Sequence, residues 1–202
     1  MAQAEEVTLV ALGDSLTQGY GLAEEAGFVP QLEAWLEENG AEVSVVNAGV
    51  SGDTTAGGLA RAEWSLTPEI EGMIVALGGN DLLRGVDPEV SRANLRGILE
   101  VAEDQEVPVL LVGLEASGNY GQDYKVAFDA MYAELADEFD ALLAPDFLAG
   151  IRGEAKDSSA MRRFMQGDGI HPNAEGVARI VDELGPDVLK LVERIEAAGR
   201  SD

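Results

Sequence analysis

The sequence predicts an α/β fold in which one parallel β-sheet is covered by helices on both faces. Short apolar runs alternate along the chain with longer stretches of helical period. The 202 residues are 46% hydrophobic, which suits one domain with one core. Strands that alternate with helices in this way favour a parallel sheet buried on both sides.

Five apolar runs have the length of strands, and none approaches the ~18 apolar residues of a membrane-spanning helix. We therefore expect no stable membrane insertion. The predicted strands cover residues 7–12, 43–47, 73–77, 107–114 and 141–143.

The intervening helices carry recognisable start and stop signals. An apolar stripe that begins at Phe28 and includes Trp35 predicts a helix that Asn39 and Gly40 terminate. Asp87 and Pro88 fit the N-cap and first position of a helix that reaches residue 103.

A last helix is predicted after His171 and Pro172, with a bend near Gly185 and Pro186. Its apolar stripe consists of Val177, Ile180, Val181, Leu184, Val188, Leu189 and Val192.

Residues 1–202 are expected to form this one domain, with flexible ends at 1–6 and 197–202. Ala2, Gln3 and Ala4 resemble the small-residue edge of a signal-peptide cleavage site, although no charged or apolar region precedes them. One interpretation is a periplasmic or secreted protein whose signal is absent from this sequence, and the alternative is a cytoplasmic protein.

The chain is strongly acidic, with a net charge of -25 from 38 acidic and 13 basic residues. This charge repels phosphate backbones and anionic bilayers, so we expect no nucleic-acid partner. Only three of the basic residues are lysines, and both a salt-adapted surface and an ordinary acidic protein fit this composition. With no cysteine, the chain has no disulfide, thiolate nucleophile or zinc-thiolate site.

Ligands of open parallel sheets bind beyond the carboxyl ends of the strands, so we expect functional residues in the segments that follow the strands. Ser15 follows the first strand and stands where a helix N-cap is expected, which is the ordinary role of such a serine. The single histidine, His171, comes three residues after Asp168 in a loop containing Gly167 and Gly169. An aspartate in this position can orient one imidazole nitrogen while the other takes a proton from a serine.

The same strand ends offer donors for an oxyanion. The backbone N–H of Gly52, in a flexible turn after the second strand, and the Asn80 side-chain amide, after the third, are candidates. The N–H of Ser15 itself, at a helix N-terminus, is a third. Each has a plain alternative as a turn or cap residue, but their joint occurrence at successive strand ends favours catalysis.

Other site classes fit less well. The glycines around Ser15 lack the lysine spacing of a P-loop and the dinucleotide fingerprint. Ser51 resembles the elbow serine of α/β-hydrolases, but Asp53 stands where that motif needs glycine. One histidine and unpatterned carboxylates predict neither a metal site nor a cofactor.

Four sequence blocks resemble, in the same order, those of the GDSL or SGNH hydrolase superfamily. They are GDSL at 13–16, NAGVSGDTT around Gly52, LGGND ending in Asn80 and Asp81, and DGIHP from Asp168. Longer stretches such as GDSLTQGYGL and MQGDGIHPNAEG look like the bacterial arylesterase, thioesterase I and lysophospholipase L1 group. The resemblance covers nearly the whole chain and implies a flavodoxin-like α/β/α sandwich with strand order 2-1-3-4-5.

By position, the resemblance implies Ser15 as nucleophile, His171 as base, Asp168 as its orienting acid, and an oxyanion hole from Ser15, Gly52 and Asn80. It implies a serine esterase for aryl and short- to medium-chain acyl esters, with thioesters and lysophospholipids as further substrates. A carbohydrate acetylesterase of the same superfamily is the alternative. A binding role without catalysis also stays open.

The expected partner is a small-molecule ester, and the sequence leaves the oligomeric state open. Leu82 stands where relatives often carry a small residue, which would narrow the acyl site. Apolar residues near the predicted strand ends are candidates to line a substrate groove, with a core role equally open for each: Leu82, Leu83, Leu114, Tyr120, Phe164 and Met165.

Overall fold

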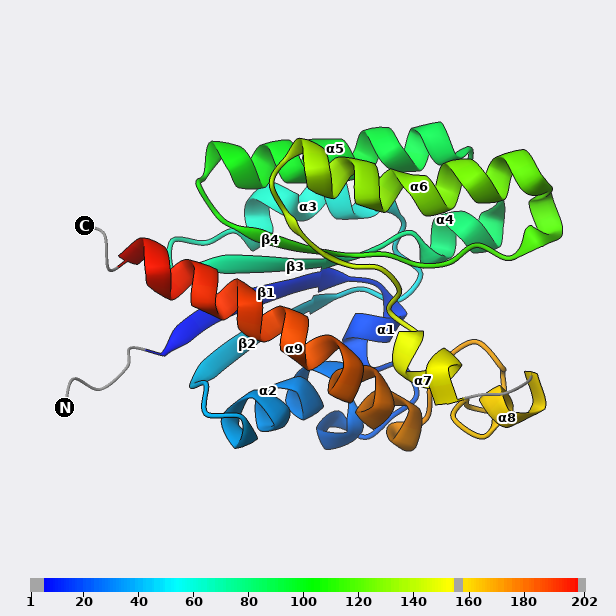
Figure 1. Cartoon of the computed structure of the whole chain (residues 1–202), viewed down its shortest axis with the longest axis horizontal. Coiled ribbons are helices and arrows are strands. Elements are labelled where there is room, and N and C mark those ends of the chain that lie inside the picture. The colour runs from blue at the N-terminus through cyan, green and yellow to red at the C-terminus, as the bar shows by residue number, and fades with distance from the viewer. Residues whose placement is uncertain (1–5, 155–157, 200–202) are drawn as a thin grey trace.

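Five parallel strands lie in the order β2-β1-β3-β4-β5 in the computed structural model, which describes residues 6–154 and 158–199 (Figure 1). The predicted α/β architecture and strand order are confirmed. The strands are β1 (Val7–Gly13), β2 (Val43–Gly49), β3 (Gly72–Ala76), β4 (Val109–Val112) and β5 (Leu142–Ala144).

β4 is shorter than the run of 107–114 that predicts it. The N–H of Val107 bonds to Ala102 O and closes the preceding helix, and Pro108 has no N–H to give to the sheet. At the other end, Leu114 leaves the sheet toward the cavity described below. An apolar run therefore marks the strand but not its ends.

Helices cover both faces of the sheet, as Figure 1 shows. One layer holds α3 (Thr55–Ser65), α4 (Gly79–Arg84), α5 (Pro88–Asp104) and α6 (Gln122–Glu138), and the other holds α1 (Ser15–Gln18), α2 (Phe28–Glu38), α7 (Ala149–Glu154), α8 (Ser158–Arg162) and α9 (Ala174–Gly199). Short 3-10 helices cover Glu24–Ala26 and Gly118–Tyr120.

Alternate residues of each strand supply two separate hydrophobic cores. On β1, Leu9 and Ala11 join the core packed under α2 and α9, whereas Val10 and Leu12 join the core under α3, α5 and α6. Successive strand side chains point to opposite faces, so one continuous apolar run fills both cores.

The predicted helix signals act as expected. The Asp87 side chain accepts from Glu89 N at 3.0 Å and caps α5, with Pro88 at its first turn. Gly40 follows α2 in a left-handed conformation, with a φ of +85°.

The last helix, α9, is one continuous helix with Pro186 inside it. Its Gly185 packs against the Trp35 ring, where a Cβ would come within 2.5 Å. Because α9 runs through Gly199, residues 197–199 are helical. Residues 1–5 and 200–202, which contain the predicted cleavage-site edge and most of the two predicted flexible ends, lie outside the described residues.

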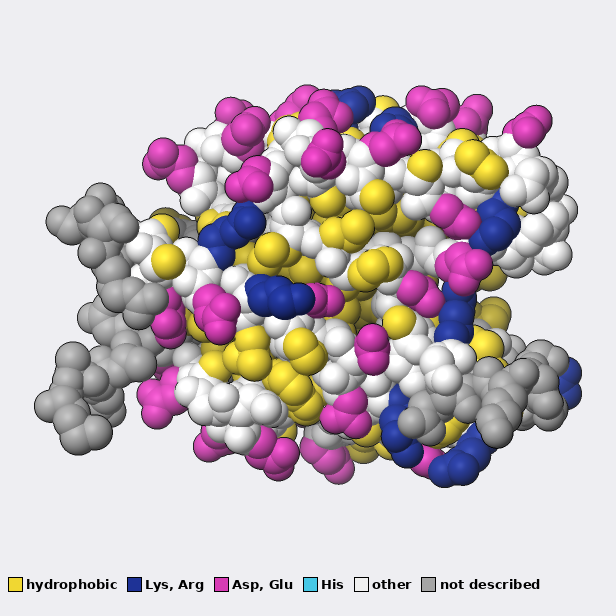
Figure 2. All heavy atoms as spheres, viewed as in Figure 1, with side chains coloured by type: hydrophobic (Ala, Val, Ile, Leu, Met, Phe, Trp, Pro, Cys, Tyr) yellow, Lys and Arg dark blue, Asp and Glu magenta, His cyan; other side chains and the backbone are white. Residues whose placement is uncertain are grey.

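Acidic side chains are spread over the surface that Figure 2 presents, in agreement with the net charge. In the part of the chain that the structure describes, no helix is both long and apolar enough to span a bilayer. What matters for function is the edge of the sheet where β1, β2 and β3 end, because the loops that follow these strands meet there.

Candidate active site

The segments after β1, β2 and β3 and the loop before α9 meet at one cavity of about 330 Å³. Ser15, Gly52, Asn80 and His171 all line it. These residues are far apart in sequence, and each was predicted from its position at the end of a strand or in the histidine loop. Asp168 stands behind His171, away from the cavity.

Ser15 is the first residue of α1 and not its cap. Asp14 caps the helix, because its Oδ1 accepts from Leu16 N at 3.0 Å. The Ser15 hydroxyl is therefore not used as the N-cap of α1, and it lies within hydrogen-bond distance of His171. Gly13 is required here, since a Cβ on it would meet Thr17 Oγ1 at 1.9 Å.

His171 bridges the serine and the aspartate. Its Nε2 lies 2.8 Å from Ser15 Oγ, and its Nδ1 lies 2.7 Å from Asp168 Oδ2. The other carboxylate oxygen of Asp168 accepts from the N–H groups of Ile170 and His171, at 2.9 and 3.0 Å. Hydrogen bonds from the His171 ring and from these backbone groups lower the pKa of Asp168 to about 2.

The loop of His171 is fastened to the segment after α1 by one side chain. Gln166 Nε2 donates to Tyr20 O at 2.8 Å and to Pro172 O at 2.9 Å, and Gln166 N donates to His171 O at 2.7 Å. The ring of Tyr20 lies 4.6 Å from the His171 ring, measured between centroids. Sequence reasoning missed Gln166 and Tyr20, because neither belongs to a recognised catalytic pattern.

The candidate oxyanion donors face the same cavity. Gly52 has a φ of +80°, a conformation that favours glycine, and Arg84 donates to its carbonyl at 2.8 Å. Asn80 lies in the first turn of α4, and its Nδ2 donates to Asp14 Oδ2 at 3.2 Å. Burial raises the pKa of Asp14 to about 6.

Leucine side chains form much of the cavity wall. Leu82, Leu83 and Leu114 line it, as the sequence predicts. The sequence does not single out Leu148, in the segment after β5, or Ile170, the residue before His171, although both line the cavity.

Three of the predicted groove residues do not line this cavity, which corrects the expectation for them. Phe164 is 4% exposed in the core shared by α2 and α9, and Met165 packs against that core. Tyr120 is 48% exposed, and its hydroxyl donates to Leu83 O at 3.3 Å from outside the wall. Closeness in sequence to a functional loop does not fix the direction of a side chain.

The charged side chains of Glu115 and Arg152 also line the cavity. Arg152 pairs with Glu115 at 2.7 Å and with Asp146 at 3.3 Å, so the cationic group that lines the cavity is already neutralised. Lys125 pairs with Glu115 from the other side at 3.0 Å. Among residues 6–154 and 158–199, no group of three or more histidine or carboxylate side chains is arranged to hold a metal ion.

Comparisons with known proteins point to one family. The profile of the GDSL-like Lipase/Acylhydrolase family matches residues 11–179. Esterase TesA of Pseudomonas aeruginosa is 37% identical over 191 residues, which are 94% of this chain and 92% of that protein.

Two further likenesses extend over most of the chain. The Escherichia coli protein named thioesterase 1/protease 1/lysophospholipase L1 is 37% identical over 187 residues, which are 92% of this chain and 85% of that one. The crystal structure of AlinE4, a SGNH-hydrolase family esterase, is similar with a TM-score of 0.75 and 41% identity, over 94% of this chain and 98% of that chain.

Proposed function

Since the chain belongs to the GDSL-like lipase/acylhydrolase family and is an esterase, we propose which esters it hydrolyses and how. Its substrates are aryl and short- to medium-chain acyl esters, and the reaction passes through an acyl-enzyme on Ser15. The observation that carries the proposal is the contact of His171 Nε2 with Ser15 Oγ at 2.8 Å, while Asp168 holds the other ring nitrogen. A serine in this setting has a base to remove its proton and a partner that orients the base.

The reaction proceeds in two steps. Ser15 Oγ attacks the ester carbonyl as His171 Nε2 takes its proton, and the C=O bond becomes a C–O⁻ single bond. The oxyanion accepts from the N–H groups of Ser15 and Gly52 and from the Asn80 amide. The tetrahedral intermediate then expels the alcohol, which takes the proton from His171. Water, activated by the same imidazole, repeats the sequence on the acyl-enzyme and releases the acid.

The cavity supports a modest acyl group. Its volume of about 330 Å³ is at the low end of the roughly 300–1,000 Å³ typical of ligand pockets. Its leucine walls favour an apolar acyl chain, which the sugar-facing site of a carbohydrate acetylesterase would not require. Thioesters and lysophospholipids are included in the proposal because the Escherichia coli relative carries both activities in its name.

A substrate series tests the proposal. Purified enzyme is assayed on matched p-nitrophenyl esters and acyl thioesters of increasing chain length, beside acetyl-xylan, with Ser15→Ala as the control. We expect highest kcat/KM on short to medium aryl esters and loss of turnover in the variant. Equal activity of wild type and Ser15→Ala would refute the role of Ser15, and preference for acetyl-xylan would favour the alternative.

A further inference from the structure

The segments that carry the candidate oxyanion donors are tied to one another by buried and half-buried polar side chains. Asp81, directly after Asn80, accepts from Thr55 N at 2.9 Å and from Thr55 Oγ1 at 2.6 Å, which joins the third strand end to the segment after Gly52. Arg61 donates to Ala48 O at 2.7 Å and to Gly13 O at 2.9 Å, which joins the second strand end to the first.

Asp14 makes the remaining tie, between the first segment and the third. Its side chain is 3% exposed. Oδ1 accepts from Leu16 N at 3.0 Å, and Oδ2 accepts from Asn80 Nδ2 at 3.2 Å. Gly79 leaves the space for this contact, because a Cβ there would stand 3.1 Å from Asp14 Oδ2.

The chemistry of the pair fixes which end of the Asn80 amide faces Asp14. An ionised carboxylate only accepts hydrogen bonds, so it selects the amide nitrogen and excludes the amide oxygen. The nitrogen carries two hydrogens, and the one not given to Asp14 is available to the cavity. An amide without this partner is free to rotate by half a turn and present its oxygen, which would repel an oxyanion.

We propose that Asp14 is a positioning residue of the esterase reaction, which holds the Asn80 amide so that its N–H faces the developing oxyanion. This inference rests on the function proposed above. Asp14 need not touch substrate, and its effect on the reaction passes through Asn80.

The variant Asp14→Asn separates this role from helix capping, because asparagine is as good an N-cap as aspartate. Its oxygen can still accept from Leu16 N, but its NH₂ group then faces Asn80 and attracts the amide oxygen of that residue. The expected result is a fall in kcat of about 10- to 100-fold on a p-nitrophenyl ester with little change in KM.

A double-variant cycle shows whether the effect passes through Asn80. Asn80→Ala alone should lower kcat by about 10²- to 10³-fold. In that background, Asp14→Asn should change kcat by about twofold or less, because the amide that it misorients is gone. Asp87→Asn, a change at a capping aspartate that does not line the cavity, is the matched control and should leave kcat unchanged.

Thermal unfolding measures the cost of the buried charge on Asp14. Burial disfavours the charged form of Asp14 and raises its pKa. Of the charged neighbours, His171 lowers this pKa and Asp53 raises it. The folded state then binds more protons than the unfolded state between about pH 4 and pH 6, so ionised Asp14 destabilises the fold above this range. Asp14→Asn should therefore raise Tm at pH 8, by an amount that shrinks as the pH falls toward 4.

The outcomes separate this inference from the proposed function. A wild type without esterase activity, or an active Ser15→Ala variant, would refute the function itself. An active wild type with the expected Asn80→Ala loss, but with Asp14→Asn equal to wild type, would overturn the inference alone. Equal fold-losses from Asp14→Asn in both backgrounds would also overturn it.

Discussion

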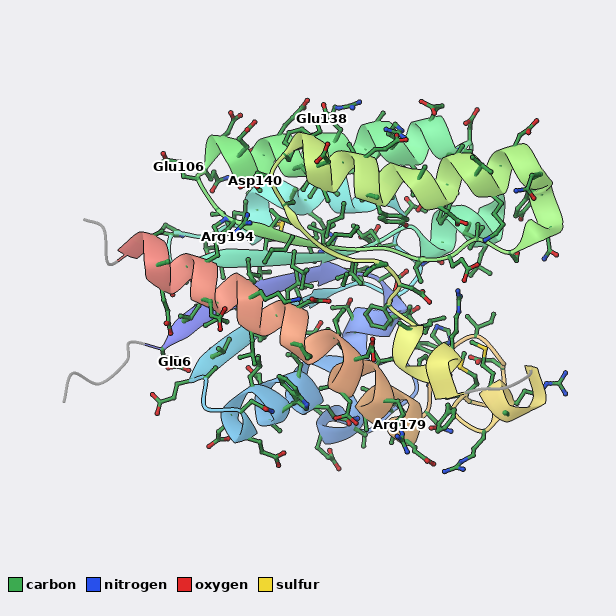
Figure 3. All side chains as sticks on the ribbon, viewed as in Figure 1. Glu6, Glu106, Glu138, Asp140, Arg179 and Arg194 are labelled. Atoms are coloured by element: carbon green, nitrogen blue, oxygen red, sulfur yellow. The ribbon has the colours of Figure 1, made fainter. Side chains whose placement is uncertain are left out.

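A cavity of about 330 Å³ lies at each end of the strands, yet within the described residues only one of these two is lined by candidate catalytic side chains. The cavity at the carboxyl ends of the strands is lined by Ser15, Asn80 and His171. The cavity at the opposite edge is lined by Glu103, Glu106, Asp140 and Arg194 with apolar neighbours, and Figure 3 labels the last three of these at that end.

Helix direction explains the difference. α1 and α4 begin at the first cavity, so the N–H groups that have no partner within these helices and the positive ends of the helix dipoles lie beside it. α5, α6 and α9 end around the second cavity, where carbonyl groups and negative dipole ends collect. Arg194 accordingly binds Asp140 there, through its carbonyl and its carboxylate. A parallel sheet thus produces one edge suited to an oxyanion and one that is not.

The largest effect is expected from the group that orients the base. Asp168→Asn should lower kcat/KM by about 10³- to 10⁴-fold, because the amide no longer holds the His171 ring in the productive tautomer. Since the pKa of Asp168 is lowered to about 2, this carboxyl is ionised throughout the assay range and the loss should persist between about pH 5 and pH 9. Steady-state kinetics across pH measures it.

Asp187→Asn is the matched control, since Asp187 pairs with Lys190 at the same i,i+3 spacing on α9. It should leave kcat/KM unchanged. A similar loss in both variants would mean that the change reflects folding and not the orientation of His171.

A smaller effect is expected from Gln166, whose side chain holds the loop of His171 against the segment after α1. Gln166→Ala removes the bonds to Tyr20 O and Pro172 O, and we expect kcat to fall by about 10-fold as His171 becomes less well placed. Gln31→Ala is a close control, because the Gln31 side chain also donates to two carbonyls that are far apart in sequence, those of Ala26 and Ala174. Loss of activity in the control alone would contradict this role.

At the opposite edge, a change should alter stability and not catalysis. Glu106 has a φ of +58° just after α5, where glycine is the usual residue. Glu106→Gly should raise the free energy of unfolding by about 0.5–1 kcal/mol, because it relieves the left-handed strain. Glu103→Gly, inside the last turn of α5, should lower it by about 1 kcal/mol. Urea unfolding measures both, and kcat/KM should be that of wild type in each.

The sequence predicts features that depend on local chemistry. The alternation of apolar runs predicts the sheet, and Asp87 with Pro88 predicts the start of α5. The single histidine, with Asp168 three residues earlier, predicts a pair that the structure brings to Ser15.

Features that depend on tertiary packing are not predicted in this way. Asp14 and Ser15 are both good N-caps, and only the structure shows that Asp14 takes the role. Phe164 and Met165 are close in sequence to His171 but turn into the core, whereas Leu148 reaches the cavity from beyond β5. Side-chain direction at these positions depends on which elements pack together.

Covalent labelling tests the central claim most directly, namely that the carboxyl edge of the sheet activates Ser15. The protein is treated with an alkyl fluorophosphonate, and the site and rate of modification are measured by peptide mass spectrometry. We expect one adduct per chain, on Ser15, formed in step with loss of esterase activity and much more slowly in His171→Ala. An inactivated enzyme labelled at another residue, or full activity with Ser15 modified, would contradict it.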